Sequence, residues 1–296
     1  MAIQQESSQP KRSAARLRVM LLSPSDRADL VREAERLLPL VRQHADVATA
    51  DLSAPDDLSH VDFDLAMVFG GDGSMLRAAH QMGRRQRPVV GVNLGKLGFL
   101  ADLSPEEFEA QLPTICSGML PVVEHLMFEC QLSQGDKVLW RQLGLNEAAV
   151  FAGPPFSILQ IDLYVDLELV TSYSCDGLIV STPVGSTAHS LSAGGPILRK
   201  DLQAFVISPI SAHTLTNRPV VDSAERVYEI VVADPHPGTS LVVDGKVLAE
   251  LKPGDRVRID RSEARFKMLA VPGHSYYRPL REKLGWGGRL LPGRDC

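Results

Sequence analysis

A carboxylate lies among three glycines in the segment Gly70-Gly71-Asp72-Gly73, directly after the apolar run "FDLAMVF". Glycines permit positive φ angles and let backbone N–H groups approach an anion closely, so such a turn can cradle phosphate. A helix that begins near Ser74 adds a dipole that favours phosphate at its N-terminus. Asp72 would repel phosphate unless it contacts a hydroxyl proton or a metal ion. A simple tight turn, for which Asp and Gly are both ordinary residues, is the alternative.

The glycine turn matches neither of two common nucleotide-binding motifs. It is not the G-x-G-x-x-G of a dinucleotide fold, and it lacks the Gly-Lys-Ser/Thr of a P-loop. Any phosphate chemistry at this turn therefore belongs to another class.

Three later segments also carry residues suited to a ligand. "GVNLGKLGFLADL" (91–103) is glycine-rich and follows the next apolar run, and Asn146-Glu147 sets an amide beside a carboxylate. In "CDGLIVSTPVGSTAHSLSAGGPIL" (175–198), Ser186 and Thr187 open a short helical turn that Gly194-Gly195-Pro196 closes. Small hydroxyls and N–H groups at such a turn suit the edges of a purine and a ribose.

The elements that carry these segments alternate in an α/β rhythm over the first hundred residues. Apolar strands are expected at 17–22, in "VATADL", in "FDLAMVF" and in "RPVVGVNL", with helices between them. Ser25 and Asp26 can cap the first helix, and the second runs through Arg84. "SPEEFEAQL" (104–112) has Ser104 and Glu107 at capping-box spacing. This order predicts a parallel sheet with flanking helices.

The pattern changes after about residue 120. Short alternating runs fill 122–275, and hairpin chemistry joins several of them, at Gly135-Asp136, Asp244-Gly245 and Pro253-Gly254-Asp255. We therefore expect a disordered leader (1–16), an α/β domain with the glycine turn (17–120), a β-rich, sandwich-like domain (121–275) and a C-terminal tail (276–296).

Composition and charge exclude several function classes. The formal net charge is −5, so no basic excess indicates nucleic acid or an anionic membrane surface. No stretch approaches the ~18 apolar residues of a membrane-spanning helix. The four cysteines form no Cys-x-x-Cys pair, which argues against a zinc site or a secreted disulfide framework. The N-terminus lacks a secretory signal, and we expect a soluble, cytoplasmic protein.

The ordered motifs together resemble those of the NAD kinase family. That family's pattern reads GGDG, then N-x-G-x-LGFL, then NE, then DG followed by TP-x-GSTAY-x-LSAGGP. A later segment with HTL and RP is similar to "ISPISAHTLTNRPVV" (207–221) here. GGDG alone is shared with diacylglycerol kinases, sphingosine kinases and phosphofructokinases, whereas Asp176 to Pro196 is much more specific. The resemblance runs from about residue 65 to "KLGW" (283–286).

The resemblance implies an activity and a fold. The family phosphorylates the 2′-hydroxyl of the adenosine ribose of NAD, with ATP or, in some members, polyphosphate, and with a divalent cation. Magnesium or manganese is expected here, because the chain offers hard oxygen ligands, although no metal ligand is identified. An α/β domain precedes a β-sandwich-like domain, the tail returns to the first domain, and members form dimers or tetramers. Whether NADH is also used stays open.

The resemblance also implies site residues. The family's proton acceptor falls on Asp72, within the phosphate loop Gly70, Gly71 and Gly73. Arg77 lies one helical turn later, where it reaches phosphate or is simply a solvated helix charge. The positions matching the family's dinucleotide contacts are Asp72, Gly73, Asn146, Glu147, Asp176, Thr187, Ala188, His189, Ser190, Leu191 and Ser192.

Several departures from the family pattern and two rival functions accompany this prediction. Val184 replaces a family Thr, and His189 replaces the Tyr of GSTAY, which keeps a ring but loses the phenol's reach. A lipid kinase that shares GGDG is one rival, although no basic amphipathic helix suits a membrane surface. A non-catalytic dinucleotide sensor is the other, but it would be expected to lack Asp72.

Overall fold

A computed structural model of the chain describes residues 16–24, 27–49, 56–95, 97–101, 103–154, 157–213 and 218–285. Nearly all of the expected leader, the Ser25-Asp26 cap, residues 214–217 and the end of the tail lie outside these ranges. No helix in the described ranges is long and apolar enough to cross a membrane.

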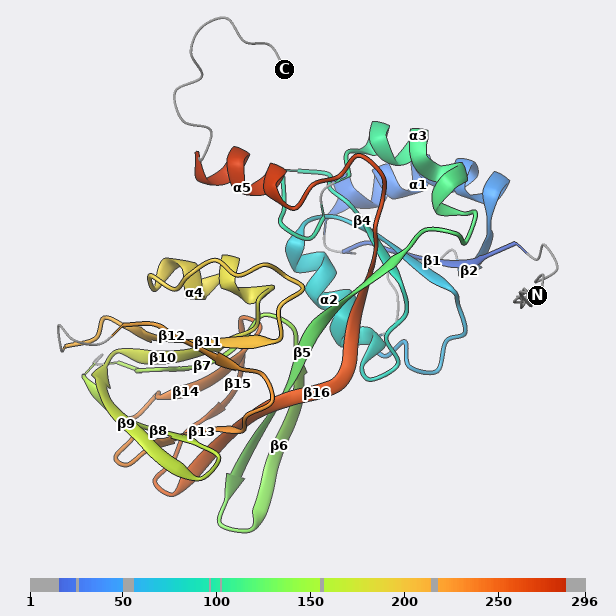
Figure 1. Ribbon diagram of the computed structural model, residues 1–296. Coiled ribbons are helices and arrows are strands. Elements are labelled where there is room, and N and C mark those ends of the chain that lie inside the picture. Colours follow the sequence, from blue (N-terminus) through green and yellow to red (C-terminus); the bar gives the residue numbers. More distant parts are fainter. Residues whose placement is uncertain are drawn as a thin grey trace, which may run out of the picture.

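The N-terminal part is built on four parallel strands. They lie in the order β2 (Asp46–Thr49), β1 (Arg18–Leu22), β3 (Leu65–Phe69) and β4 (Val89–Val92) (Figure 1). Successive residues of a strand point to opposite faces. Val19, Leu21 and Met67 therefore pack with α1 (Ala28–His44) and α3 (Pro105–Ile115), whereas Met20 and Val68 pack with α2 (Asp72–Met82). The predicted α/β domain with a parallel sheet and flanking helices is confirmed.

This sheet continues into the β-rich part through one long strand. β16 (Asp255–Leu269) pairs parallel with β4 through Met268 and Val89, and antiparallel with β5 (Val122–Gln134) along most of its length (Figure 1). β13 (Tyr228–Val232), β8 (Leu159–Val165) and β9 (Glu168–Cys175) extend the sheet beyond β16, and β6 (Lys137–Gly144) pairs with β5. The domain boundaries near residues 120 and 275 stay predictions.

A second, antiparallel sheet completes the β-rich part. Its order is β12 (Val220–Ser223), β11 (Ala204–Ile210), β10 (Gly177–Ser181), β7 (Glu147–Phe151), β14 (Ser240–Val243) and β15 (Lys246–Glu250). Buried side chains from both sheets form one core, which includes Phe128, Tyr228, Phe205 and Val150. The β-rich, sandwich-like second half is therefore confirmed.

Residues near the ends of several helices and strands determine where these elements begin or end. Ser104 and Glu107 form the expected capping box, in which each side chain accepts a hydrogen bond from the other residue's backbone N–H. Asp244 and Gly245 both have positive φ, +47° and +77°, as a two-residue hairpin turn between β14 and β15 requires. Helix α2 begins at Asp72, two residues before the expected start near Ser74, because Gly71 already takes the N-cap position.

Short helical segments and the tail finish the chain. A 3₁₀ turn, η1 (Gly185–Thr187), leads into α4 (His189–Ser192), and α5 (Tyr277–Leu284) follows β16. Arg278 on α5 pairs with Glu107 of α3 at 3.0 Å. Tyr276 donates a hydrogen bond from its hydroxyl to the Leu198 carbonyl at 2.8 Å. The segment before and through α5 thus contacts both the α/β part and the loop after α4.

Candidate functional site

The carboxylate of Asp72 is held by the backbone of the loop that follows β4. Its Oδ2 accepts a hydrogen bond from the Phe99 N–H at 2.8 Å. Its Oδ1 accepts from the N–H groups of Leu100 at 2.8 Å and Ala101 at 3.2 Å. Strands β3 and β4 are parallel neighbours, so both loops leave the same edge of the sheet, which is where ligands bind in open α/β sheets. Three donors fix the orientation of this side chain.

Glycines make that arrangement possible at two positions. Gly70 has φ +140°, and a Cβ there would lie 2.1 Å from the Ser74 hydroxyl oxygen. A Cβ on Gly98 would lie 2.2 Å from Oδ1 of Asp72, so a side chain at that position would displace the carboxylate. Around Gly71 and Gly73, by contrast, an added Cβ would meet no atom of the described residues within 4 Å beyond its own chain neighbours. The backbone of the turn is therefore open on the side where a ligand could approach.

Asn146 and Glu147 are organised by Asp244, a residue from the hairpin turn between β14 and β15. Oδ1 of Asp244 accepts from the N–H groups of Asn146 at 2.7 Å and Glu147 at 3.1 Å. Oδ2 accepts from the Leu145 N–H at 2.8 Å, and the side chain is fully buried. Sequence reasoning predicted only a turn at Asp244. A hairpin Asp-Gly pair is ordinary, so nothing in residue type indicated this second role.

The Glu147 side chain is buried beside the ring of His189. Oε1 lies 2.9 Å from Nδ1 of His189, and Oε2 is buried without a hydrogen-bond partner in the described part of the chain. Burial and, to a lesser extent, the nearby charge of Asp244 raise the pKa of Glu147 to about 7, against the opposing effect of His189. A buried carboxyl oxygen without a partner is costly unless a ligand or water satisfies it.

The turn from Gly185 to Ser192 packs directly on Asn146. A Cβ on Gly185 would lie 2.1 Å from the Asn146 carbonyl oxygen, which also accepts a hydrogen bond from the Thr182 N–H. The Thr187 hydroxyl donates to the Val184 carbonyl at 3.1 Å, and Val184 itself is buried against α2. The side chain of Ser190 is fully buried against Ser208, so its hydroxyl has a structural partner.

His189 is an exposed polar side chain of this turn. Its side chain is 55% exposed, and its ring lies edge-on to Phe151 with centroids 6.2 Å apart. Leu191 is partly buried, and Ser192 is exposed. A ring that is held on one side and open on the other is suited to stacking on a base.

Two predicted contact residues, Arg77 and Asp176, have other side-chain partners. Arg77 projects from α2 toward Asp56, with 3.9 Å between guanidinium and carboxylate, and its side chain is 40% exposed. It lines a small cleft with Ser23 and Gln81, on the side of α2 that faces the end of β1. Asp176 is half-exposed at the start of β10 and lies 3.8 Å from Nε2 of His213. Both side chains therefore lie close to partners other than the central carboxylates.

Helix α2 links the two loops that carry the central groups. It begins at Asp72, and two turns later His80 brings Nε2 to 2.9 Å from Oδ2 of Asp244. Gln142 bonds the other ring nitrogen of His80 at 3.0 Å. Sequence reasoning did not identify His80, because a histidine on a helix face is more often structural than functional.

The described residues contain no group of three or more His, Cys, Asp or Glu side chains that could hold a metal ion. Both oxygens of Asp72 already accept backbone N–H groups. The described part of the chain therefore offers no preformed cluster of ligands for a metal ion.

Comparison with known proteins covers most of the chain. Residues 14–120 match the family model of the ATP-NAD kinase N-terminal domain, and residues 145–271 match that of the ATP-NAD kinase C-terminal domain. An NAD kinase of Rhodopirellula baltica is 55% identical over 273 residues, which is 92% of this chain and 88% of that protein. An NAD kinase of Shewanella frigidimarina is 41% identical over 83% of this chain and 79% of that protein.

Solved structures show the same architecture. A yeast NADH kinase complexed with NADH has a TM-score of 0.84, covers 97% of this chain and 95% of its own, and at 21% identity shows the fold alone. An NAD kinase from Archaeoglobus fulgidus in complex with ATP has a TM-score of 0.73 and 28% identity, over 91% of this chain and 99% of its own. The two family models, the identity to curated relatives and the shared fold agree, and the chain belongs to the NAD kinase family.

Proposed function

We propose that this chain transfers a phosphoryl group from ATP to the 2′-hydroxyl of the adenosine ribose of NAD, with Asp72 as proton acceptor. The chain is a phosphotransferase of the NAD kinase type. The assignment to Asp72 rests on one observation. Backbone hydrogen bonds hold its carboxylate in place at the start of α2, beside a glycine turn that is open to solvent. The family relationship supports the substrate and the hydroxyl.

The proposed step follows from the hydrogen bonds of Asp72. Oδ2 accepts only the Phe99 N–H among described residues, so it keeps a lone pair for the sugar hydroxyl. As the hydroxyl oxygen attacks the γ-phosphorus, the bond to the β,γ-bridging oxygen breaks, ADP leaves, and the proton passes to Asp72. The backbone donors hold the carboxylate in place before substrate arrives, which reduces the entropy cost of reaching the reacting geometry.

Binding of the dinucleotide is assigned to the groups around Glu147. The unpartnered Oε2 of Glu147 supplies a buried polar contact, and the exposed face of His189 supplies a stacking surface for a base. Asn146 is held in place by Asp244. The other residues proposed to contact NAD are those that match the family motif, namely Gly73, Arg77, Asp176, Thr187, Ala188, Ser190, Leu191 and Ser192. Gly70 and Gly71 are proposed to form the phosphate loop.

Magnesium or manganese enters the proposal as a partner of the nucleotide. Phosphoryl transfer from ATP to NAD brings two polyanions together, so their negative charge must be neutralised. The described residues hold no preformed metal cage. Magnesium is usually bound through substrate phosphates with one or two carboxylates, so the metal–ATP complex is the proposed phosphoryl donor. The residues around Asp72 and Glu147 bind and orient the sugar and take up its proton.

A cytoplasmic location and a homo-oligomeric state complete the proposal. The composition supports the first, and the family relationship supports the second. No observation on this chain favours a lipid kinase or a non-catalytic sensor over a phosphotransferase acting on NAD.

The deciding experiment measures NADP formation in a coupled assay with ATP and magnesium. NAD, NADH and diacylglycerol are offered in parallel as acceptors, and polyphosphate is offered as an alternative donor. We expect phosphate on NAD and none on diacylglycerol. Transfer to the lipid alone would overturn the assignment, and no transfer to any acceptor by folded protein would favour a sensor.

A further inference from the structure

The loop whose backbone holds Asp72 is itself held by a lysine from the segment between α4 and β11. The Lys200 ammonium donates a hydrogen bond to the Phe99 carbonyl oxygen. That carbonyl and the Leu100 N–H belong to one peptide group, and the Leu100 N–H donates to Oδ1 of Asp72 at 2.8 Å. A single peptide group therefore lies between the ammonium of Lys200 and the carboxylate of the proposed proton acceptor.

The hydrogen bond from Lys200 acts on both ends of this peptide group. A charged donor makes a stronger hydrogen bond than a neutral one, and hydrogen bonds in a chain polarise one another. An ammonium on the Phe99 carbonyl therefore strengthens the Leu100 N–H as a donor and resists rotation of the peptide plane. The Phe99 N–H donates to Oδ2 of Asp72 at 2.8 Å, so a rotation of this segment would disturb the donors to both carboxylate oxygens.

The backbone that carries Lys200 is fixed at three points. Nδ1 of His125, a residue that is 5% exposed, lies 3.2 Å from the Lys200 carbonyl oxygen, and the ring donates because a carbonyl can only accept. Two residues earlier, the Leu198 N–H donates to the Ser186 hydroxyl at 3.0 Å, and the Leu198 carbonyl accepts from the Tyr276 hydroxyl at 2.8 Å. The lysine side chain therefore starts from an ordered backbone, which lowers the entropy cost of placing its ammonium on the loop.

The same backbone leads back to the turn that is proposed to bind NAD. Ser186, which accepts the Leu198 N–H, is fully buried in η1, and η1 runs into α4 with His189. A series of hydrogen bonds therefore connects this turn, through Leu198 and Lys200, with the loop that holds Asp72.

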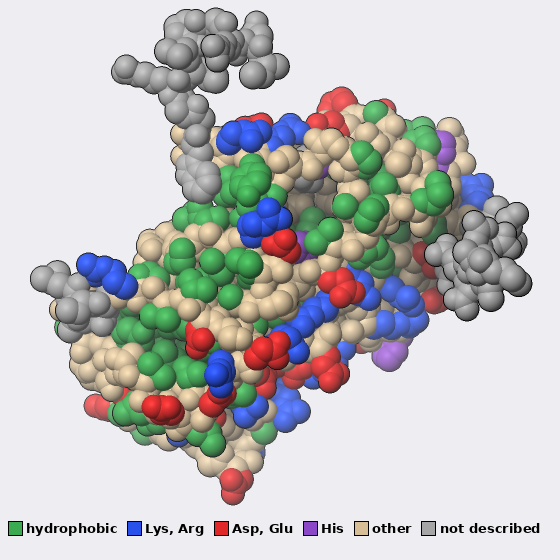
Figure 2. Space-filling model, in the orientation of Figure 1, with side chains coloured by type: hydrophobic (Ala, Val, Ile, Leu, Met, Phe, Trp, Pro, Cys, Tyr) green, Lys and Arg blue, Asp and Glu red, His purple; other side chains and the backbone are tan. Residues whose placement is uncertain are grey.

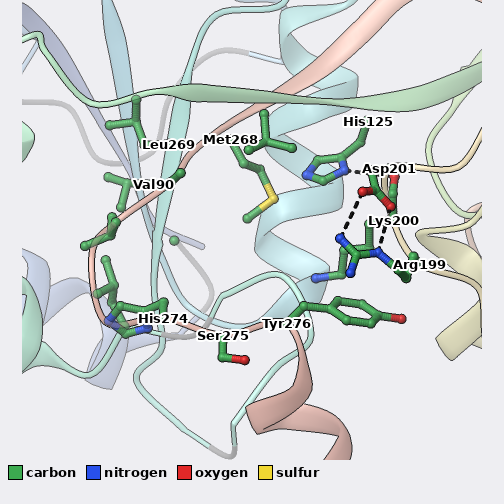
Figure 3. A pocket seen from close by; sticks show the side chains of 15 residues that line it. Val90, His125, Arg199, Lys200, Asp201, Met268, Leu269, His274, Ser275 and Tyr276 are labelled. Carbon is green, nitrogen blue, oxygen red and sulfur yellow. Dashed lines mark hydrogen bonds and ion pairs between the residues drawn. The ribbon is translucent and has the colours of Figure 1, made fainter.

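Lys200 lies in the wall of a cavity of about 320 Å³, beside the segment that leads into α5 (Figure 3). Its ammonium is 5.7 Å from the centre of the Tyr276 ring, a distance at which an aromatic ring attracts a cation. Figure 2 shows the same face hollowed between α5 and the β5–β16 pair. A different side chain at position 200 would therefore have room in the cavity, and the fold should tolerate substitution there.

We propose that Lys200 is a positioning residue for phosphoryl transfer, which holds residues 99–101 in the orientation that lets Asp72 accept the proton of the sugar hydroxyl. This inference rests on the proposed function of Asp72. Lys200 is not one of the residues proposed to contact NAD, and it acts on Asp72 through the peptide group between Phe99 and Leu100. Loss of its ammonium should therefore slow the transfer step and leave the affinity for NAD unchanged.

The first test measures backbone hydrogen exchange by NMR in the full chain, and it needs no activity. In Lys200→Met, the N–H groups of Phe99 and Leu100 should exchange about tenfold faster than in wild type, because a hydrogen bond from a charged group no longer holds the loop. The amides of β10, which pairs with β7 and β11, should keep their exchange rates. Equal exchange of Phe99 and Leu100 in both proteins would overturn the positioning role.

The second test separates kcat from KM in the assay of NADP formation. The kcat of Lys200→Met should be about tenfold lower than that of wild type, with the KM for NAD little changed. Lys200→Arg keeps a charged donor and should restore most of the rate. An unchanged kcat in Lys200→Met, or a higher KM for NAD with no loss of kcat, would overturn the proposal. Should Lys200→Met not fold, Lys200→Gln, which is uncharged and one bond shorter, decides.

Arg199→Met is the matched control. Arg199 precedes Lys200 and lies over the same ring, with its guanidinium 5.9 Å from the centre of Tyr276. Its side chain donates to Asp201 and Tyr277 and makes no hydrogen bond to the described residues of the 97–101 loop. The control should therefore keep the wild-type kcat and the wild-type exchange of that loop. An equal loss in both variants would assign the effect to the Tyr276 contact and overturn the role of the Phe99 carbonyl.

The double variant Asp72→Asn/Lys200→Met shows whether Lys200 acts through Asp72. Its kcat should be no lower than that of Asp72→Asn alone, because the group that Lys200 positions is already lost. A further tenfold loss would overturn action through Asp72. Should wild type transfer no phosphate to NAD, the proposed function fails, whereas the exchange rates of Phe99 and Leu100 still decide whether Lys200 holds the loop.

Discussion

The carboxylate of Asp244 and the imidazole of His80 meet in the interior, with Oδ2 2.9 Å from Nε2. The Nε2 atom makes no hydrogen bond of good geometry within the described residues, so the two side chains are in close polar contact without a linear hydrogen bond. Through it, the helix that starts at Asp72 is joined to the hairpin that holds Asn146 and Glu147. The proposed catalytic and binding groups therefore share one support.

Asp244→Asn separates the two roles of Asp244. Asn-Gly is as good a hairpin turn as Asp-Gly, so the turn should survive. The amide, however, sets an NH₂ group against a backbone donor, and a buried unsatisfied donor costs about 1–3 kcal/mol. We expect a lower free energy of unfolding and a higher KM for NAD. Lys246→Met, on the exposed side of the same hairpin, is the control. Wild-type KM in Asp244→Asn would contradict this role.

Asp72→Asn tests the proposed base. Asn is an acceptable residue at the turn but cannot take up a proton, so kcat should fall by ~10²–10⁴. NAD should still bind, which equilibrium titration can show. Stability should also fall, because three backbone N–H groups point at this side chain. Full turnover by the variant would leave Asp72 as a turn residue only, and rescue by extra magnesium would assign it to the metal.

Glu147→Gln tests the buried carboxyl through the pH dependence of stability. The folded pKa of about 7 lies above the unfolded value of 4.5, so the folded state binds more protons between these values. The free energy of unfolding should therefore fall as pH rises through this window. In wild type this fall should amount to about 1–3 kcal/mol. Glu147→Gln stays neutral, so its free energy of unfolding should not fall in this window. Urea unfolding at several pH values measures this free energy. The same pH dependence in both proteins would contradict a raised pKa of Glu147.

His189→Ala tests the proposed stacking surface. The ring is more than half exposed, so its loss should change the melting temperature little. Loss of one base-stacking contact should raise the KM for NAD by the equivalent of ~1–3 kcal/mol. Phe at this position should recover most of the affinity. An unchanged KM with a lower melting temperature would instead assign His189 to packing against Phe151 and Glu147.

Removal of divalent cations tests the metal. With EDTA in excess, turnover should stop, because the charge on the transferring phosphates is no longer neutralised. Stability should not change, because the described residues hold no metal cage. Magnesium or manganese should restore the rate in proportion to the metal–ATP complex. Full activity after exhaustive chelation would rule out this role for the cation.

The sequence by itself determined the two-part architecture and the position of the glycine turn. Alternating apolar residues with helical periods predicted the α/β half, and turn residues such as Asp244-Gly245 predicted the hairpins of the β-rich half. Both signals are local, because a strand's two faces and a turn's φ angles are set by the residues themselves. The order of the motifs along the chain was also enough to indicate the family.

Only the tertiary structure decided what the central carboxylates contact. Asp72 is held by residues 27 to 29 positions away, and Asp244 by residues 97 to 99 positions away. In both cases the donors are backbone N–H groups, which almost every residue carries, so residue types leave no sign of them. The start of α2 at Asp72, the burial of Glu147 and the contact of Lys200 with Phe99 depend equally on distant segments meeting. Residue type showed which groups could do the chemistry, and folding decided which backbone would hold them.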